Sequence, residues 1–270
     1  MSYPGPPALS PRWAVFRRWR DVSLNVLYPP RCRSCAVLLQ EPESQEGLLR
    51  WLCPRCVGGL DRLQSPCCSV CGEAFEGAMD GPFRCSNCED RRFAFDFALS
   101  AFRATGPMRE LLHKFKYNGQ LTLRTALAES LRQTLEDERL RKEDLADWLL
   151  VPVPLHWLRY LRREFNQSWE LCRELSRSTG IPAARVLRRT RHTPKQARLT
   201  RHERLENLRG VFALRRGGGW PGAAGLDLTG RKILLVDDVL TTGATTHECA
   251  QVLRRQGGAA RVVVLTAARG

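Results

Sequence analysis

The sequence predicts an α/β protein in which a parallel sheet with crossover helices follows a small cysteine-rich module. From residue 91 onward, apolar patterns typical of strands alternate with patterns typical of helices. Nine of the eleven cysteines lie before residue 91, among many turn residues. One buried strand, Ile233–Val236, leads into two acids and a short loop of small and hydroxyl residues. We therefore expect two domains, residues 1–90 and residues 91–270.

The first part of the α/β domain is predicted to contain one strand and then helices. Apolar residues nearly alternate over Phe93–Phe102, as in a half-buried strand, and Gly106-Pro107 ends that pattern. Helical spacing then relates the apolar residues of Met108–Phe115 and of Leu121–Leu140.

The second part alternates strands and helices along the chain. In order, we expect a strand at 149–154, a helix at 165–178, short strands at 186–187 and 211–214, a strand at 233–236, a helix at 245–255 and a closing strand at 262–265. The prolines of the first strand suit a sheet edge or a strand end. Gly180 suits a helix C-terminus, and the glycine-rich stretch 217–225 is typical of a flexible loop.

Composition excludes several classes of protein. Hydrophobic residues make up 43% of the 270 residues, which is enough for a packed core. No apolar run approaches the 18 residues of a membrane-spanning helix. Residues 1–30 show no continuous apolar segment or cleavage site of a signal peptide. We therefore expect a cytoplasmic protein whose cysteines are reduced and bind metal rather than form disulfides.

The net charge of +15 is concentrated in one stretch of the chain. Residues 159–209 carry 14 Lys and Arg against 5 Asp and Glu, whereas residues 1–90 carry ten of each. Arginines on solvated helix faces would explain part of this excess. Its coincidence with loops near the candidate site favours a polyanionic partner.

The segment Ile233–Thr245 is the most informative part of the sequence. A buried strand is followed by two carboxylates, a short loop and the start of a helix, where backbone N–H groups and the helix dipole favour an anion. Adjacent carboxylates can accept hydrogen bonds from the hydroxyls of a ribose and can help to hold Mg²⁺. An acid pair that only caps the helix would explain one acid and not both. The candidate binding residues are Asp237, Asp238, Thr241, Thr242, Gly243, Ala244 and Thr245.

Over all thirteen residues this segment resembles the phosphoribosyl-pyrophosphate (PRPP) signature of type I phosphoribosyltransferases. The resemblance implies a type I phosphoribosyltransferase-like fold that binds PRPP with Mg²⁺. It places the ribose hydroxyls on Asp237 and Asp238 and the 5′-phosphate on residues 241–245. In the helix that follows, helical spacing predicts that Cys249 belongs to the core, and we expect His247 to be solvated.

Four CxxC pairs predict two structural zinc ions. Seventeen residues separate the first pair from the second, and thirteen separate the third from the fourth, which suits zinc ribbons. Sequential pairing gives two four-cysteine sites, and cross-braced pairing is the alternative. Cys67 is left over beside a ligand. Redox disulfides need one pair rather than four, and iron–sulfur clusters use tighter spacing. The predicted ligands are Cys32, Cys35, Cys53 and Cys56, and then Cys68, Cys71, Cys85 and Cys88.

Two basic loops, at 155–167 and 188–209, separate the strand at 149–154 from the phosphate loop. A type I site needs a loop that binds pyrophosphate and a mobile loop that covers the transition state. Basic and amide side chains after a strand end suit both tasks. The candidates are Arg162, Arg163, Asn166, Gln167, Lys195, Gln196 and Arg201.

Together these motifs resemble the ComF family, the competence-associated phosphoribosyltransferase-like proteins that include ComFC. The resemblance rests on the paired zinc ribbons, the Phe115–Gly119 motif, the VPVPLH run, the Phe165–Gln167 motif and the DDVLTTGAT loop, over roughly residues 24–268. It implies handling of single-stranded DNA during natural transformation, with other DNA-uptake proteins as partners. Glu164 stands where the family commonly has glycine, which weakens the expectation of tight pyrophosphate binding.

Two other functions are compatible with the same motifs. One is a nucleobase salvage phosphoribosyltransferase, and the other is a zinc-ribbon regulator that only senses PRPP. The presence of a nucleobase pocket would distinguish a salvage enzyme from the other functions. Such a pocket would have to come from residues 91–145 or from the zinc module. The sequence does not identify an acceptor for a transferred ribosyl group.

Overall fold

The computed structural model of the chain describes residues 29–40, 47–75, 77, 81–117, 120–155, 165–191, 208, 210–215 and 226–270. Contacts divide the chain into two compact units, Met1–Gly58 and Gly59–Gly270. The division lies well before the domain boundary predicted at residue 90. Within the described ranges, no helix has both the length and the apolar character needed to cross a membrane.

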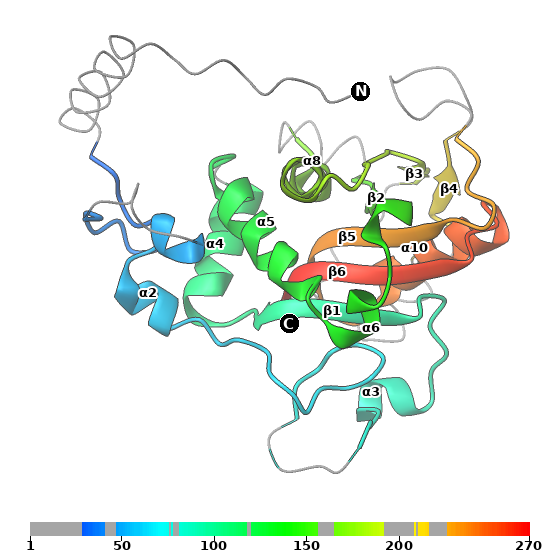
Figure 1. Cartoon of the computed structure of the whole chain (residues 1–270), viewed down its shortest axis with the longest axis horizontal. Coiled ribbons are helices and arrows are strands. Elements are labelled where there is room, and N and C mark those ends of the chain that lie inside the picture. Colours follow the sequence, from blue (N-terminus) through cyan, green and yellow to red (C-terminus); the bar gives the residue numbers. More distant parts are fainter. Residues whose placement is uncertain are drawn as a thin grey trace, which may run out of the picture. The chain divides into compact units, whose positions relative to one another are not determined.

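Four parallel strands form the central sheet of the larger unit (Figure 1). Their spatial order is β1 (Phe97–Arg103), β6 (Arg261–Arg269), β5 (Lys232–Leu240) and β2 (Trp148–Pro152). The proline-containing strand β2 lies at one edge, as predicted, and an isolated bridge joins its Leu150 to Ala183. The predicted parallel α/β sheet is therefore confirmed.

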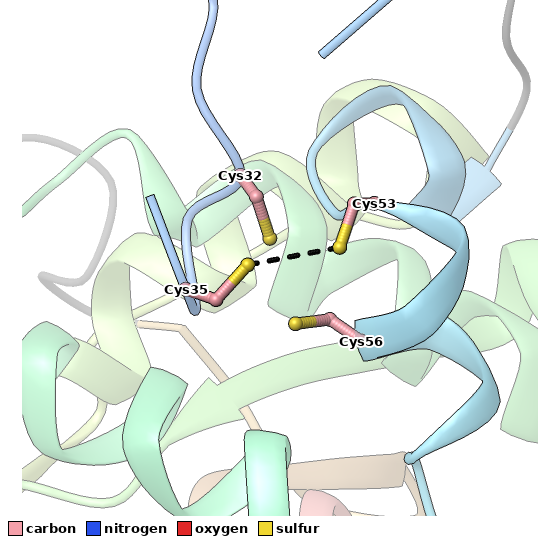
Figure 2. Close-up of side chains that lie close together, drawn as sticks. All are labelled: Cys32, Cys35, Cys53 and Cys56. Atoms are coloured by element: carbon pink, nitrogen blue, oxygen red, sulfur yellow. Dashed lines mark hydrogen bonds between the residues drawn. The ribbon is translucent and has the colours of Figure 1, made fainter. Parts of the chain in front are cut away.

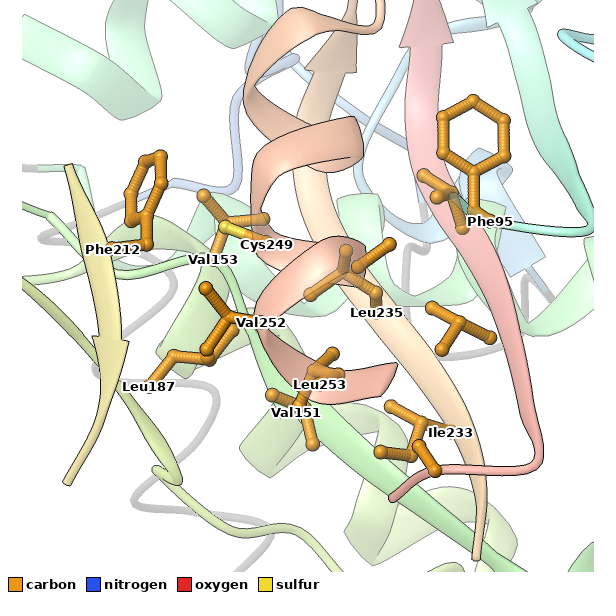
Figure 3. Close-up of a cluster of buried hydrophobic side chains, with 14 of the residues drawn as sticks. Phe95, Val151, Val153, Leu187, Phe212, Ile233, Leu235, Cys249, Val252 and Leu253 are labelled. Atoms are coloured by element: carbon orange, nitrogen blue, oxygen red, sulfur yellow. The ribbon is translucent and has the colours of Figure 1, made fainter. Parts of the chain in front are cut away.

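Helices cover both faces of this sheet. Helices α5 (Leu123–Thr134) and α8 (Gln167–Thr179) pack against each other; α5 also contacts β1 and β6, and α8 contacts β2 and β5. Helix α10 (Ala244–Arg255) packs Cys249 and Leu253 into a core with Ile233 and Leu235 (Figure 3). The other helices of the described ranges are η2 (Gly47–Arg50), α2 (Pro54–Gly58), α3 (Ser86–Glu89), α4 (Gly106–Tyr117), α6 (Glu138–Arg141) and η3 (Leu145–Asp147).

Several predicted boundaries need correction. The helix predicted over Leu121–Leu140 is two helices, because Asp137 accepts a hydrogen bond from the Arg139 N–H and starts α6 anew. The predicted strand over Phe93–Phe102 begins only at Phe97. Helix α8 begins after Asn166, which caps it, and ends at Gly180 as expected.

The two short strands do not join the parallel sheet. Strands β3 (Leu187–Arg189) and β4 (Phe212–Leu214) form an antiparallel ribbon of their own. Buried residues of the ribbon, Leu187 and Phe212, pack into the same core as α10 (Figure 3). The predicted loop at 217–225 lies outside the described residues.

The second cysteine cluster is built onto the free edge of β1. The N–H of Leu63 donates to Ala101 O at 3.1 Å, and the N–H of Ala98 donates to Val70 O at 2.8 Å. Three of the four cysteines, Cys68, Cys71 and Cys88, belong to the same hydrophobic core as the sheet. This shared core explains why the contacts divide the chain at residue 58 and not at residue 90.

Candidate functional site

The acid pair lies on the part of strand β5 that extends beyond the end of its pairing with β2. Pairing of β2 with β5 ends at Pro152 and Val236, whereas pairing of β5 with β6 continues through Asp237 and Val239. The strand thus extends to Leu240, four residues beyond the end predicted from the sequence. Both carboxylates therefore lie on a strand held on one side only, at the carboxyl edge of the sheet, where open α/β sheets bind ligands.

Two side chains from distant helices contact the acid pair. Lys116 Nζ, from the last turn of α4, lies 3.0 Å from Asp238 Oδ2. Ser168 Oγ, from the first turn of α8, donates to Asp237 Oδ1 at 3.0 Å. Sequence analysis did not assign either residue to the site, although Lys116 lies within the Phe115–Gly119 motif that it identified.

Burial makes the acid pair electrostatically costly. Removal from water, together with repulsion from Asp238, raises the pKa of Asp237 to about 7. Lys116 and the hydrogen bonds from Ser168 and the Asp238 N–H oppose this rise. Among the described residues the site therefore brings two acids together with the Lys116 ammonium, an arrangement suited to a ligand that brings hydroxyl donors or a cation.

The loop predicted to bind a phosphate leads directly into helix α10. Gly243 has φ of +75° and immediately precedes the helix, which starts at Ala244. Its carbonyl accepts from the His247 N–H at 2.8 Å and from Thr246 Oγ1 at 3.0 Å, which closes the first turn. Thr241 is exposed and Thr242 is half-buried. Residues 241–245 thus present the N-terminus of a twelve-residue helix, where N–H groups and the dipole favour an anion.

Phe93 packs against the glycine of this loop, and His247 holds the segment that carries Phe93. A Cβ on Gly243 would lie 2.9 Å from a ring carbon of Phe93, so a larger residue would collide there. His247 is half-buried rather than solvated, which corrects the expectation from sequence. Its Nδ1 accepts from the Ala94 N–H at 2.9 Å, and burial lowers its pKa. The imidazole therefore acts as a neutral anchor for the segment that carries Phe93.

The residues predicted to bind pyrophosphate are only partly described. Asn166 caps α8, since its side chain accepts from the Trp169 N–H at 3.3 Å and donates to Val153 O at 3.2 Å. Gln167 is 3% exposed. The Asn166 amide thus holds the start of the helix that carries Ser168. The other candidates lie outside the described residues: Arg162, Arg163, Lys195, Gln196 and Arg201.

The eight predicted cysteine ligands gather in two groups of four, paired sequentially (Figure 2 shows the first). Within each group the sulfur atoms lie within 4.8 Å of one another. Cys35 Sγ and Cys53 Sγ are 3.7 Å apart, and Cys71 Sγ and Cys85 Sγ are 3.5 Å apart. Tetrahedral zinc with Zn–S bonds of about 2.3 Å requires sulfur separations of about 3.8 Å. The geometry therefore fits two structural zinc ions and excludes cross-braced pairing.

The three remaining cysteines lie outside both groups. Cys67 donates its thiol to Gln64 O at 3.0 Å. Cys172 and Cys249 are fully buried, and burial raises the pKa of both thiols well above the usual value. The assignment of Cys249 to the core is therefore confirmed.

Comparison with known proteins agrees with these features. Residues 23–91 match the double zinc ribbon domain family. The chain is 32% identical over 201 residues to the DNA utilization protein YhgH of Escherichia coli K12, covering 74% of this chain and 82% of that protein. It is 29% identical to competence protein F of Haemophilus influenzae (75% and 85% covered) and 27% identical to competence protein ComFC of Bacillus subtilis (87% and 88% covered).

Solved structures give more distant matches. The allosteric regulatory enzyme of purine biosynthesis matches with a TM-score of 0.36 and 19% identity, over 58% of this chain and 30% of the other. Glutamine PRPP amidotransferase from Bacillus subtilis matches with a TM-score of 0.35 and 19% identity, over 57% and 30%. This chain thus aligns with less than a third of either enzyme.

Proposed function

Since the chain belongs to the ComF family of competence and DNA utilization proteins, we propose that it binds PRPP at the β5–α10 turn and handles single-stranded DNA. The PRPP proposal rests on one observation, the position of two acids close to the N-terminus of a helix. Asp237 and Asp238 lie on β5, and Gly243, five residues after Asp238, has a left-handed backbone and opens the N-terminus of α10.

Each part of this turn suits one part of PRPP. Asp237 and Asp238 offer carboxylate oxygens to the vicinal ribose hydroxyls, and residues 241–245 offer N–H and hydroxyl donors to the 5′-phosphate. Lys116 supplies a positive charge 3.0 Å from Asp238, which limits the repulsion between the acids and the phosphates. Carboxylate oxygens are also ligands that Mg²⁺ accepts, so Asp237 and Asp238 would help to hold the ion that accompanies PRPP.

The proposal for single-stranded DNA is supported by charge. The stretch 159–209 carries most of the excess of arginine and lysine, and its described part includes strand β3, which pairs with β4 just beyond the stretch. In that ribbon Arg188 Nε donates to Leu214 O and Arg215 Nε donates to Leu187 O. Burial, with a contribution from Arg188, lowers the pKa of Arg215. Two cations held close together form a surface to which a polyanion would bind favourably.

We also propose that the protein is cytoplasmic. Eight of its eleven cysteines are arranged as zinc ligands in the two groups of four, and zinc-binding thiolates persist where disulfides do not form.

Titration calorimetry of the full chain with PRPP and Mg²⁺ tests the PRPP proposal. Asp237→Asn and Asp238→Asn should each weaken binding by about tenfold or more, a loss of about 1.4 kcal/mol. Asp227→Asn is a matched control, because this exposed acid accepts from the Thr229 N–H and lies before strand β5, away from the acid pair in sequence. Equal affinity in the wild type and both site variants would refute the assignment of the ribose hydroxyls.

A further inference from the structure

A buried arginine connects the second cysteine cluster to the start of the phosphate loop. Arg269, 5% exposed, ends strand β6. Its Nη2 lies 2.7 Å from Glu73 Oε2 and 3.9 Å from Cys71 Sγ. Its Nη1 donates to the carbonyls of Leu240 and Thr241 at 3.0 and 2.6 Å. One guanidinium therefore contacts both a cysteine ligand and the backbone where the loop begins.

A second connection runs from the last cysteine of the cluster to the far side of the loop. Phe93, five residues after Cys88, stacks on Phe95 with ring centroids 4.8 Å apart and lies directly against Gly243. The next residue, Ala94, donates its N–H to His247 in the first turns of α10. The segment between the cluster and strand β1 thus supports the glycine on which the loop turns.

The cluster is itself fixed to the sheet. Gly72, directly after Cys71, has φ of +68°, and a Cβ there would lie 2.9 Å from Ala98 O on β1. The N–H of Ala98 donates to Val70 O at 2.8 Å, within the same cysteine turn. Movement of this turn would therefore disturb the edge strand and the Arg269 contacts together.

We infer that the second zinc centre positions the loop 241–245 for its ligand, with Arg269 as the positioning residue. The inference rests on the proposed PRPP site. Cys71 would be one of the zinc ligands, and the guanidinium that contacts its sulfur also holds the loop carbonyls, as groups beside a metal ligand commonly fix its position. Loss of the ion frees the cysteine turn and removes this partner, and Arg269 then no longer fixes the carbonyls of Leu240 and Thr241. Zinc at this cluster and PRPP at the loop bind with positive coupling, which is reciprocal by thermodynamic necessity.

The test compares two arginines of one strand. Arg269→Gln should weaken PRPP binding by about fivefold or more, with zinc content unchanged, and Arg269→Lys should recover part of the loss. Arg261→Gln is the control, because Arg261, at the opposite end of β6, pairs with Glu143 far from the loop in sequence and strand position. Calorimetry gives the affinity, and elemental analysis gives the zinc content of each variant.

Zinc release tests the reciprocal effect and needs no change near the loop. Cys32→Ser leaves the second cluster intact, and saturating PRPP should slow chelator-driven zinc release from this variant by about fivefold or more. Cys85→Ser leaves the first cluster, which lies in the other compact unit, and PRPP should not change its release rate. If the wild type binds no PRPP, the proposed function itself is wrong. If it binds PRPP but Arg269→Gln matches Arg261→Gln and release is unchanged, only the coupling is wrong.

Discussion

At the scale of single residues, Asp237 and Asp238 are neighbours in sequence with different partners. Asp238 lies against Lys116, whereas Asp237 accepts hydrogen bonds from a hydroxyl and a backbone N–H. Removal from water and repulsion from Asp238 raise the pKa of Asp237 to about 7, although Lys116 and the hydrogen bonds to Asp237 oppose the rise.

This shift predicts how stability depends on pH. Because the pKa of Asp237 is higher in the folded than in the unfolded protein, the folded protein binds the carboxyl proton more tightly. The free energy of unfolding therefore falls as pH rises from about 4 to 7 and Asp237 ionises. Asparagine cannot ionise and loses nothing over this range. The free energy of unfolding of Asp237→Asn, relative to the wild type, should therefore increase between pH 5 and pH 8. Urea unfolding at both pH values, without added Mg²⁺ or PRPP, measures it. A difference that is equal at the two pH values would contradict the shift.

A comparison of Gly180 and Gly243 distinguishes the cost of a left-handed backbone from the cost of a steric clash. Gly243 and Gly180 have φ of +75° and +77°, but only Gly243 has neighbouring atoms where a Cβ would be placed. Gly180→Ala should cost about 1–2 kcal/mol of stability from the left-handed backbone alone. Gly243→Ala should cost about 1–3 kcal/mol more, because the methyl group meets the Phe93 ring. Equal losses of stability in the two variants, measured by thermal or urea unfolding, would show that the Phe93 ring moves aside at little cost.

At the scale of elements, the two cysteine clusters are small pieces of chain that depend on metal. We predict two zinc ions per chain and one in Cys32→Ser, because each cluster supplies all four ligands of its ion. Cys67→Ser is the matched control, since this thiol lies outside both groups of four and donates to a carbonyl oxygen. Elemental analysis decides the outcome. A loss of zinc from Cys67→Ser would mean that the ligand register is wrong.

The elements that the sequence predicted well are those with a strong local signal. The strand, loop and helix around Asp237 follow from four apolar residues, two acids and a glycine, and the zinc pairing follows from spacing. The short strands at 187–189 and 212–214 carry too few residues to reveal their partner, and they pair with each other. Strand β5 runs past its predicted end because β6 continues to pair with it.

The rest of the candidate site could not be predicted, because it depends on contacts between distant segments. Lys116 lies 122 residues before its partner Asp238 in the sequence. Ser168 lies 69 residues before its partner Asp237. Arg269 lies four residues beyond the strand predicted at 262–265, yet it is buried and donates to backbone carbonyls. No local pattern marks such residues, since folding alone brings their partners together.

At the scale of the whole molecule, charge is divided unevenly between the parts of the chain. Residues 1–90 carry no net charge, and residues 159–209 carry nine excess positive charges. A polyanion should therefore bind through the arginine-rich part and not through the zinc ribbons.

We predict that single-stranded DNA binds the full chain with a steep dependence on salt, about one unit of logarithmic slope per phosphate contacted. Replacing Arg162 and Arg163 together by alanine should weaken binding and reduce the slope. Replacing Arg31 and Arg33 in the first cysteine turn is the control. Fluorescence anisotropy over a salt series, with and without PRPP, measures both effects. Unchanged binding in the first variant and a loss in the second would place the DNA on the ribbons.

The most direct test of the PRPP site is a crystal structure of the full chain with PRPP and Mg²⁺. The account predicts the 5′-phosphate against the N–H groups of residues 241–245 and the ribose hydroxyls within hydrogen-bonding distance of Asp237 and Asp238. PRPP bound elsewhere, for example on the arginines of the β3–β4 ribbon with the β5–α10 turn empty, would contradict it.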